Sequence, residues 1–359
     1  MKNKGQYTSG RKLDHIRICV DEDVERGWSG FDDVRLVHNA LPGCDLDRIR
    51  TETEFLGHRF EIPLFIAGMT GGHPESKEIN RRLARAAEEF GIGMGVGSQR
   101  AALEDPSLED TFSVVRDEAP HAFLAANLGI VQLRDHGLEW VEKAVDMIDA
   151  DAIAIHLNFL QEAIQPEGDH DARECVEALR ELCRECTLPV IVKETGSGIS
   201  AETAKACWDA GVKAIDLGGW GGTSWAAIEG IRAGEREGLN ASRLVRIGHI
   251  FEEWGIPTVV SLCEVASTGG PVIATGGIRN GLSMAKAMAL GADLSGMALP
   301  LLKPALNGEE LLFEKIKEIN QEFKVAMFLS GSCTPAELST TRAYLTGVTR
   351  DMLQNNGGI

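Results

Sequence analysis

ADAIAIHLNFLQE, residues 150–162, shows the pattern from which the fold can be predicted: it begins as an apolar strand and ends in hydrogen-bonding groups. The polar side chains at its end, HLNFLQE (156–162), are His156, Asn158, Gln161 and Glu162. The alternation of a strand places His156 and Asn158 on one face with Ala154. A lone histidine is more often a satisfied core residue, but three polar neighbours at the same strand end indicate a functional site.

Seven further runs share this pattern, since each is apolar and closes on glycine or a small polar residue. They are IPLFIAGMT (62–70), GIGMGVGS (91–98), AFLAANLG (122–129), LPVIVKET (188–195), KAIDLGG (213–219), PVIATGG (271–277) and ADLSGMALP (292–300). Helical segments lie between them; SAETAKACWDAG (200–211), for example, begins with an N-cap serine and ends on Gly211.

Strands that alternate with helices at this spacing form parallel βαβ units, and eight such units close most naturally into a (β/α)8 TIM barrel. We expect one α/β domain, with the barrel over 61–305, an N-terminal extension over 1–60 and a helical tail over 306–359. An open, doubly wound sheet is the alternative, which is disfavoured because no GxGxxG motif enters a helix.

Composition excludes several classes of function. The formal net charge of −18 argues against nucleic acid or an anionic membrane as the main partner, so an anionic substrate requires a local basic pocket. The polar N-terminus and the absence of a long apolar run predict a cytoplasmic protein. The eight cysteines are scattered, and the close pair Cys183 and Cys186 has no second pair at metal-ligand spacing.

In a TIM barrel the active site lies at the carboxyl ends of the strands, and seven of the eight expected ends carry a polar group or a glycine pair. The alternating glycines of 91–97 suggest that a flat ligand or another backbone approaches the second strand; tight packing of small residues is the alternative. The turns GGWGGTS (218–224) and TGGIRNG (275–281) form a good phosphate cradle together with the Thr223 hydroxyl, although glycines also serve turn geometry alone.

Several charged residues suggest more specific chemistry. Lys193 is either a Schiff-base lysine or a cation beside a delocalised anion such as a reduced flavin. Arg11 and Lys12 precede the barrel, in a segment that is either a solvated terminus or, with Arg100, a source of cations for a second phosphate-bearing molecule. Glu162 is the best candidate for a divalent metal, because Mg²⁺ is typically held by one or two carboxylates plus substrate phosphate oxygens.

The chain resembles the type 2 isopentenyl-diphosphate isomerases, the flavin-dependent kind, through nearly its whole length. The matching segments are RKLDHI (11–16), AGMTGG (67–72), GMGVGSQR (93–100), ANLG (126–129), HLNFLQE (156–162), VKETGSGIS (192–200), GGWGGTSW (218–225), FEEWGIPT (251–258) and ATGGIRNG (274–281). The resemblance implies an FMN-containing barrel that interconverts isopentenyl and dimethylallyl diphosphate. It also implies Mg²⁺, reduction of the flavin by NADPH, and a homotetramer or larger homo-oligomer.

The family's roles transfer to this chain motif by motif. The resemblance implies FMN contacts at Gly68, Met69, Thr70, Ser98, Asn127, Lys193, Thr195 and Thr223. It implies that the FMN phosphate lies at Gly276, Gly277 and Arg279, near Ala298 and Leu299. It implies that the substrate is bound by Arg11, Lys12, His15, Ser98, Gln99, Arg100, Asn158 and Gln161. His156, Gln161 and Lys193 are then the catalytic candidates, and Glu162 binds Mg²⁺.

The chain departs from the family pattern at three places: Phe159 stands where Pro is common, Gly68 where Pro is frequent, and Thr195 where Ser is frequent.

The implied reaction moves a double bond by adding one proton and removing another. An isolated alkene is a very weak base, so a solvated carboxylic acid is a poor donor. We therefore hypothesise that reduced FMN is the acid and base, that Lys193 stabilises its anionic ring, and that Gln161 orients the substrate.

Two rival functions remain at this point. An FMN-dependent 2-hydroxy-acid oxidase needs a histidine before the glycines of TGGIRNG, and the sequence has none there. A non-catalytic barrel that binds a phosphate or prenyl ligand shares the fold.

Overall fold

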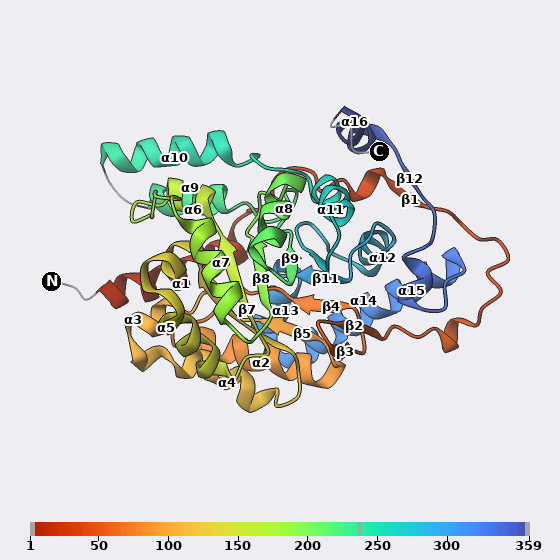
Figure 1. Ribbon diagram of the computed structural model, residues 1–359, viewed down its shortest axis with the longest axis horizontal. Helices are drawn as coiled ribbons and strands as arrows, with labels where there is room; N and C mark the ends of the chain where they lie inside the picture. Colours follow the sequence, from red (N-terminus) through yellow and green to blue (C-terminus); the bar gives the residue numbers. More distant parts are fainter. Residues whose placement is uncertain (1–3, 236–237, 356–359) are drawn as a thin grey trace.

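The computed structural model describes residues 4–235 and 238–355, and its centre is a closed barrel of eight parallel strands in the order β10-β11-β4-β5-β6-β7-β8-β9 (Figure 1). The strands are β4 (Leu64–Ile66), β5 (Gly93–Gly95), β6 (Leu124–Gly129), β7 (Ala152–Leu157), β8 (Val190–Glu194), β9 (Ala214–Asp216), β10 (Val272–Ala274) and β11 (Leu294–Met297). Each lies within one of the eight apolar runs. The TIM barrel is therefore confirmed, and the open sheet is wrong.

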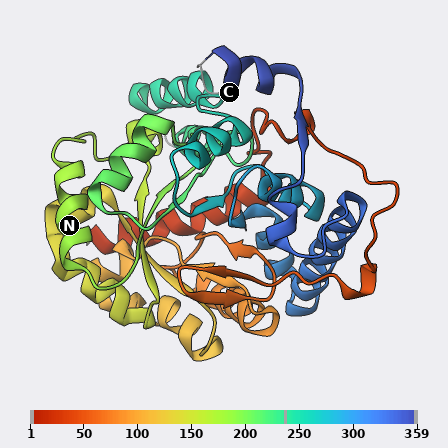
Figure 2. The same cartoon turned by 45° about the vertical axis from the view of Figure 1, so that its right-hand side comes forward.

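A layer of helices surrounds the barrel (Figures 1 and 2). They are α2 (Ser76–Phe90), α3 (Arg100–Glu104), α4 (Asp110–Glu118), α5 (Ile130–Ile148), α6 (Phe159–Ile164), α7 (Cys175–Glu185), α8 (Ala201–Ala210), α9 (Trp225–Gly234), α10 (Leu239–Phe251), α11 (Thr258–Ser267), α12 (Gly281–Ala289), α13 (Leu299–Asn307) and α14 (Glu309–Ser330). Helix α8 has the expected caps, since the Ser200 side chain accepts from the Thr203 amide and Gly211 has a φ of 102°. Within the described residues, no helix is both long and apolar enough to cross a membrane.

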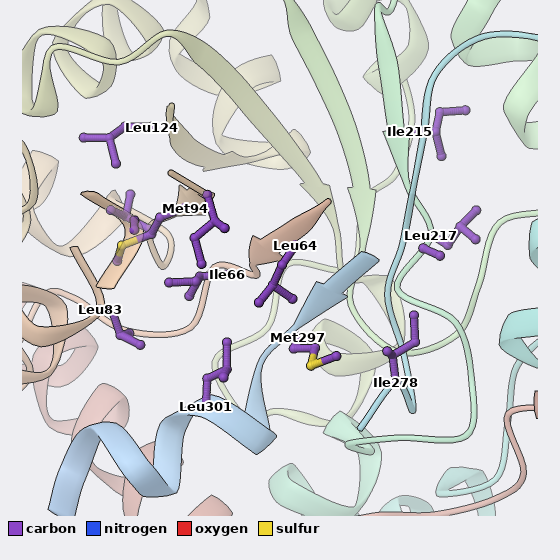
Figure 3. Packing of buried hydrophobic residues seen from close by; sticks show 14 of the residues in the cluster. Leu64, Ile66, Leu83, Met94, Leu124, Ile215, Leu217, Ile278, Met297 and Leu301 are labelled. Atoms are coloured by element: carbon purple, nitrogen blue, oxygen red, sulfur yellow. The ribbon is translucent and has the colours of Figure 1, made fainter. Parts of the chain in front are cut away.

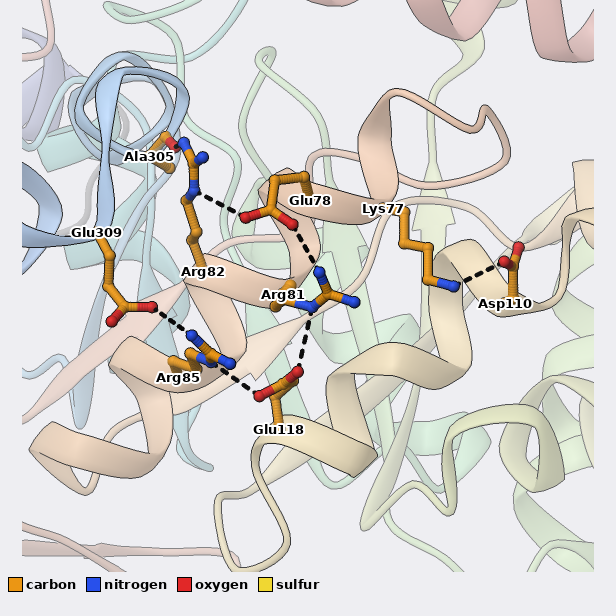
Figure 4. A network of polar contacts seen from close by, with 9 residues as sticks. All are labelled: Lys77, Glu78, Arg81, Arg82, Arg85, Asp110, Glu118, Ala305 and Glu309. Carbon is orange, nitrogen blue, oxygen red and sulfur yellow. Dashed lines mark hydrogen bonds and ion pairs between the residues drawn. The ribbon is translucent and has the colours of Figure 1, made fainter.

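Helix α14 packs against α12, α13 and α2, so the ring of helices continues beyond residue 305. The seam between α2, α4 and the start of α14 carries a network of ion pairs (Figure 4). Arg85 bridges Glu118 and Glu309 at 2.8 and 3.1 Å. The boundary expected between barrel and tail at 305/306 thus lies inside α13, and the barrel's helical layer includes α14.

The extension before the barrel contains α1 (Lys4–Asp21), β1 (Val34–Leu36), and the hairpin β2 (Thr53–Phe55) and β3 (His58–Phe60). The segment from 306 also differs from a purely helical tail: it contains α15 (Pro335–Leu338), β12 (Ala343–Leu345) and α16 (Gly347–Asn355). Strands β1 and β12 pair antiparallel, which joins the segment before the barrel to the segment after it. Residues 1–3 of the extension and 356–359 of the tail lie outside the described residues.

The alternation of the strands separates two apolar clusters. Outward-facing residues such as Ile153 and Ile155 join the large core between strands and helices, part of which is shown in Figure 3. Inward-facing Ala152 and Ala154 belong to a smaller cluster inside the barrel, with Phe60 and three other phenylalanines. Because Ala154 points inward, His156, two residues further, points into the mouth of the barrel as the sequence predicts.

Neighbouring groups leave no room for a side chain at two glycines in and beside the second strand, Gly93 and Gly97. A Cβ on Gly93 would lie 2.6 Å from the Phe60 ring and 2.8 Å from the Phe65 ring. A Cβ on Gly97 would lie 2.6 Å from the Thr70 carbonyl oxygen. The expectation of a flat ligand along this strand is therefore wrong at Gly93, where aromatic side chains fill the space, while close approach of another backbone is correct at Gly97.

Candidate active site

The strand ends enclose one cavity of about 1610 Å³, which includes open space at its mouth. All the residues assigned a site role from the sequence line it, with the single exception of Gln99. The described residues that line it without having been expected include Glu25, Gln132 and Gln165, while Glu194 and Asp216 line it at the strand ends where the sequence predicts the site. The loops that follow the strands therefore meet helix α1 at this cavity.

Gln99 is fully buried behind the cavity. Its side-chain amide donates to the Ala144 carbonyl at 2.7 Å, and its oxygen accepts from the Asn127 amide at 2.8 Å. The expectation that Gln99 binds substrate is therefore not met by this structure: its hydrogen-bonding groups are used to fasten β5 to β6 and α5. The spacing of a motif does not fix which way each side chain points.

His156 is held in a defined orientation at the end of β7. The Asn127 amide nitrogen donates to the Val96 carbonyl at 2.8 Å, which leaves the Asn127 oxygen as the acceptor for His156 Nδ1 at 2.8 Å. Burial, followed by the charges of Lys193 and other cations, lowers the pKa of His156 well below its ordinary value. The imidazole is therefore neutral at pH 7, with Nε2 as an acceptor.

Glu162 lies on α6 and is buried at the cavity wall. Its Oε1 accepts from the Asn158 amide at 2.8 Å, and its Oε2 accepts from the Gln165 amide and from the Asp169 backbone N–H at 2.5 and 2.8 Å. The described chain holds no cluster of three or more His, Cys, Asp or Glu side chains able to bind a metal. A divalent cation fits here only as a one-carboxylate site completed by ligand oxygens, which is the usual arrangement for Mg²⁺.

Helix α1 brings its cations to the mouth of the cavity, and its residue His15 attaches it to α9. His15 Nε2 lies 2.9 Å from Oε1 of Glu229, a wholly buried carboxylate on α9. The same oxygen accepts from Gln161 at 2.9 Å, and Oε2 accepts from Arg232 at 2.7 Å. Burial alone raises the pKa of Glu229, but the His15 hydrogen bond and the nearby charges outweigh it and lower the pKa to about 2.

Arg11, Lys12 and Arg100 form the basic side of the cavity, so the acidic chain does contain the local basic pocket that an anionic substrate requires. Arg11 donates to Gln165 at 3.2 Å. Burial, and then the charges of Arg11 and Arg100, lower the pKa of Lys12 to about 7. Such crowding of cations is costly without an anion between them.

The opposite side of the cavity is built from glycine-rich turns. Gly276 and Gly277 have φ of 103° and 69°, and a Cβ on Gly276 would lie 2.2 Å from the Gly219 carbonyl oxygen. The N-terminus of α13, a nine-residue helix, faces the same space through Ala298 and Leu299. Backbone held bare of side chains beside a helix N-terminus fits a phosphate group. Arg279 also lines this side, where it pairs with Glu25 at 2.6 Å.

Between the two sides lie Lys193 and its acidic neighbours. Lys193 is in register with His156 on β7 and with Asp216 on β9. Burial raises the pKa of Asp216, and the Thr275 hydroxyl donates to this carboxylate. Burial raises the pKa of Glu194 to about 7, although three successive backbone N–H groups donate to it. A flat group with a phosphate tail, such as FMN, fits between Lys193 and the glycine turns.

The sequence reasoning missed Glu229, which lies behind the cavity and contacts two site residues. A signal was present in WAAIEGIRAG: the charges of Glu229 and Arg232 are three residues apart within an apolar helical pattern. A buried charge needs a partner, and such a pair indicates an internal ion pair.

Comparison with known proteins agrees with this geometry. The model of the family "FMN-dependent dehydrogenase" matches residues 19–147 and 139–345. The chain is 61% identical over 353 residues to the isopentenyl-diphosphate delta-isomerase of Methanoregula boonei, which covers 98% of both chains. It is 50% identical over 350 residues to the isopentenyl-diphosphate delta-isomerase of Archaeoglobus fulgidus, which covers 98% of this chain and 99% of the other.

Solved structures support the fold. A mandelate oxidase variant with a monooxide FMN adduct aligns with a TM-score of 0.62 at 19% identity, over 94% of this chain and 93% of that one. A lactate oxidase of Pediococcus acidilactici aligns with a TM-score of 0.63 at 19% identity, over 88% and 84% of the two chains. At this identity the likeness concerns the barrel alone. Given the near-identical lengths and the 61% identity to a named isomerase, the chain belongs to the FMN-dependent, type 2 isopentenyl-diphosphate delta-isomerase family.

Proposed function

We propose that the protein interconverts isopentenyl and dimethylallyl diphosphate in a cavity that holds reduced FMN and Mg²⁺. The observation that supports this most is the pairing of two anion sites in one cavity: a glycine cradle on one side and the cations of Arg11, Lys12 and Arg100 on the other. A phosphate-bearing cofactor and a diphosphate substrate require two such sites. The names and identities of the relatives give the same reaction.

When bound, reduced FMN supplies the proton donor and acceptor that the double-bond shift needs. The chain's own groups then bind and orient. Lys193 places a cation at the strand end, where it stabilises negative charge on a bound ring. Gln161 is held by Glu229 at 2.9 Å, and its amide does not titrate, so it orients the substrate rather than moving a proton. His156, neutral and fixed by Asn127, adds an acceptor without adding charge.

Glu162 is the proposed Mg²⁺ ligand. Both of its oxygens are already held by hydrogen bonds, which fixes the carboxylate for coordination, as is usual for metal-binding carboxylates. Glu162→Gln is expected to raise the Mg²⁺ concentration needed for half-maximal activity. An unchanged metal titration would remove Glu162 from this role.

The rival oxidase is disfavoured by the group that precedes Gly276. A 2-hydroxy-acid oxidase needs a histidine there to accept a proton, whereas Thr275 stands at this position and donates its hydroxyl to Asp216. A measurement of turnover distinguishes an isomerase from a barrel that only binds its ligand.

The decisive experiment is an anaerobic mixture of the purified protein with isopentenyl diphosphate, FMN, NADPH and Mg²⁺, in which the allylic product is followed. Omission of FMN, NADPH or Mg²⁺ should each reduce product formation, and Lys193→Ala should abolish most of it. Activity without any flavin would contradict the proposal. NADPH as the reductant, a cytoplasmic location and a homo-oligomer of four or more subunits are part of this proposal and rest on the sequence alone.

A further inference from the structure

The loop that joins α6 to α7 folds back over the metal candidate Glu162. The Gly168 amide donates to the Gln165 carbonyl at 3.1 Å, and a Cβ on Gly168 would lie only 1.8 Å from the Glu162 carbonyl oxygen. His170 Nε2 lies 3.0 Å from the same carbonyl oxygen. The loop therefore packs directly on α6, and Asp169 lies beside Glu162.

Asp169 contacts three groups that face the cavity. Its backbone N–H donates to Glu162 Oε2 at 2.8 Å, and its Oδ2 accepts from Arg100 Nη1 at 3.2 Å. The same Oδ2 accepts from the Gln132 amide at 3.2 Å. Arg100, Gln132 and Glu162 line the cavity, whereas Asp169 does not. Asp169 therefore contacts three groups that line the cavity without lining it itself.

We propose that Asp169 is a positioning residue for the diphosphate and its metal ion: it holds Arg100 and Glu162 in a fixed relation to each other. The two ligand groups come from different elements, α3 and α6, and Asp169 contacts both. Arg100 is also held by Glu104 at 2.9 Å, so two carboxylates together fix the plane of its guanidinium. This inference rests on the proposed function for the identity of the ligand.

The geometry also predicts where the effect of Asp169 is measurable. The side chains of Arg100 and Asp169 are 25% and 37% exposed, and such solvent-accessible pairs contribute little to folding stability. Contacts behind a metal ligand or a cation, in contrast, commonly change ligand affinity strongly. The contribution of Asp169 should therefore appear in binding and not in the melting temperature.

If Asp169 acted through its charge alone, its neutralisation would change the diphosphate affinity in the opposite direction. The Asp169 carboxylate is negative and lies near an anion site, so its neutralisation would strengthen diphosphate binding if only long-range electrostatics acted. Positioning predicts weaker binding, because an amide at position 169 has no charge and only one acceptor oxygen, so it holds Arg100 less firmly and lets the guanidinium turn away from the ligand. The sign of the change in affinity separates the two explanations.

The test uses FMN-loaded protein and isothermal titration calorimetry with inorganic diphosphate at a fixed, saturating Mg²⁺ concentration. Asp169→Asn keeps the shape and the backbone N–H, and should weaken binding by about tenfold with an unchanged melting temperature. Asp169→Glu keeps the charge and should recover part of the affinity. Asp171→Asn is the matched control on the same loop, since Asp171 pairs with Arg173 at 2.6 Å and should leave the affinity unchanged.

A double variant tests whether Asp169 acts through Arg100. In an Arg100→Lys background, Asp169→Asn should weaken binding by much less than it does alone, because the guanidinium that it positions is gone. Equal or tighter binding by Asp169→Asn, a full additional loss in the Arg100→Lys background, or a matching fall in melting temperature would each overturn the inference. The readout is independent of turnover: a wild type that does not isomerise but shows this binding pattern would refute the proposed function and leave the role of Asp169 standing.

Discussion

Replacement of Glu229 by glutamine removes the buried charge that fastens α1 to the barrel. The carboxylate is wholly buried and accepts hydrogen bonds from His15, Gln161 and Arg232 on its two oxygens. Glutamine has the same shape but only one acceptor oxygen, and its NH₂ group is placed against a donor. At least one of the three hydrogen bonds is lost, and the ion pair with Arg232 is lost with the charge, while the ion pair between Arg232 and Glu167 at 2.8 Å is kept.

The structure gives the size of the effect by two routes. Loss of one partner of a buried ion pair costs about 3–5 kcal/mol of stability. Independently, a pKa displaced from 4.5 to about 2 corresponds to about 3 kcal/mol of stabilisation of the ionised carboxylate. We therefore expect Glu229→Gln to lower the free energy of unfolding by about 3 kcal/mol at pH 7.

The measurement is urea unfolding of both proteins, followed by circular dichroism. Glu235→Gln is the matched control: Glu235 follows the same helix, α9, and pairs with Arg17 on the same α1, but both side chains are 43% exposed. An exposed pair contributes little, so the control should unfold like the wild type.

The pH dependence gives a second check. The pKa of Glu229 is lower in the folded protein than in the unfolded chain, so its stabilisation is complete above about pH 5 and is lost as the pH falls towards 2. The difference in stability between wild type and Glu229→Gln should therefore shrink on acidification from pH 5. A difference below about 1 kcal/mol at pH 7, or one that stays constant down to pH 3, would refute the reasoning.

Three further predictions concern the cavity and its support. The pKa of Lys12 is lowered to about 7, so its charge is lost as the pH rises through 7. The affinity for inorganic diphosphate, measured by calorimetric titration between about pH 6 and 8, should therefore fall over that range. Lys12→Arg, which stays charged, should flatten this pH dependence. Gln99→Leu should lower the free energy of unfolding by about 2 kcal/mol, because the Ala144 carbonyl and the Asn127 amide lose their partner. The KM for isopentenyl diphosphate should stay unchanged, and a raised KM would return Gln99 to the substrate site. Gly276→Ala should reduce the FMN retained on purification, read as the ratio of flavin to protein absorbance, since its Cβ would lie 2.2 Å from the Gly219 carbonyl oxygen. Gly57→Ala is the control, because Gly57 has a φ of 81° but open space around it.

Much of this architecture was predictable because each barrel strand carries its own local signal. An apolar run closed by glycine or a small polar residue identifies a strand without knowledge of its neighbours, and the parallel βαβ rule then closes the barrel. The pairing of β1 with β12 had no such signal. Both strands have three residues, and about 300 residues separate them, so only the folded chain shows that Val34 lies opposite Leu345.

The same distinction applies to the site. Strand alternation predicts that His156 points into the barrel mouth, because the period of a strand is fixed by its backbone. It predicts nothing for Gln99, which follows the end of its strand and turns towards α5. Glu229 was missed for a related reason: its contacts with His15 and Gln161 span 214 and 68 residues of sequence.

These long-range contacts explain how an extension outside the barrel belongs to the site. Glu229 accepts from His15 on α1 and from Gln161 on α6 through the same oxygen. A displacement of α1 must therefore disturb the hydrogen bond that fixes Gln161, the group proposed to orient the substrate. The cations proposed to bind the diphosphate and the amide proposed to orient the reacting carbons are thus linked by one buried carboxylate. Glu229→Gln should consequently reduce diphosphate affinity and turnover together, whereas loss of Arg11 alone should reduce affinity first.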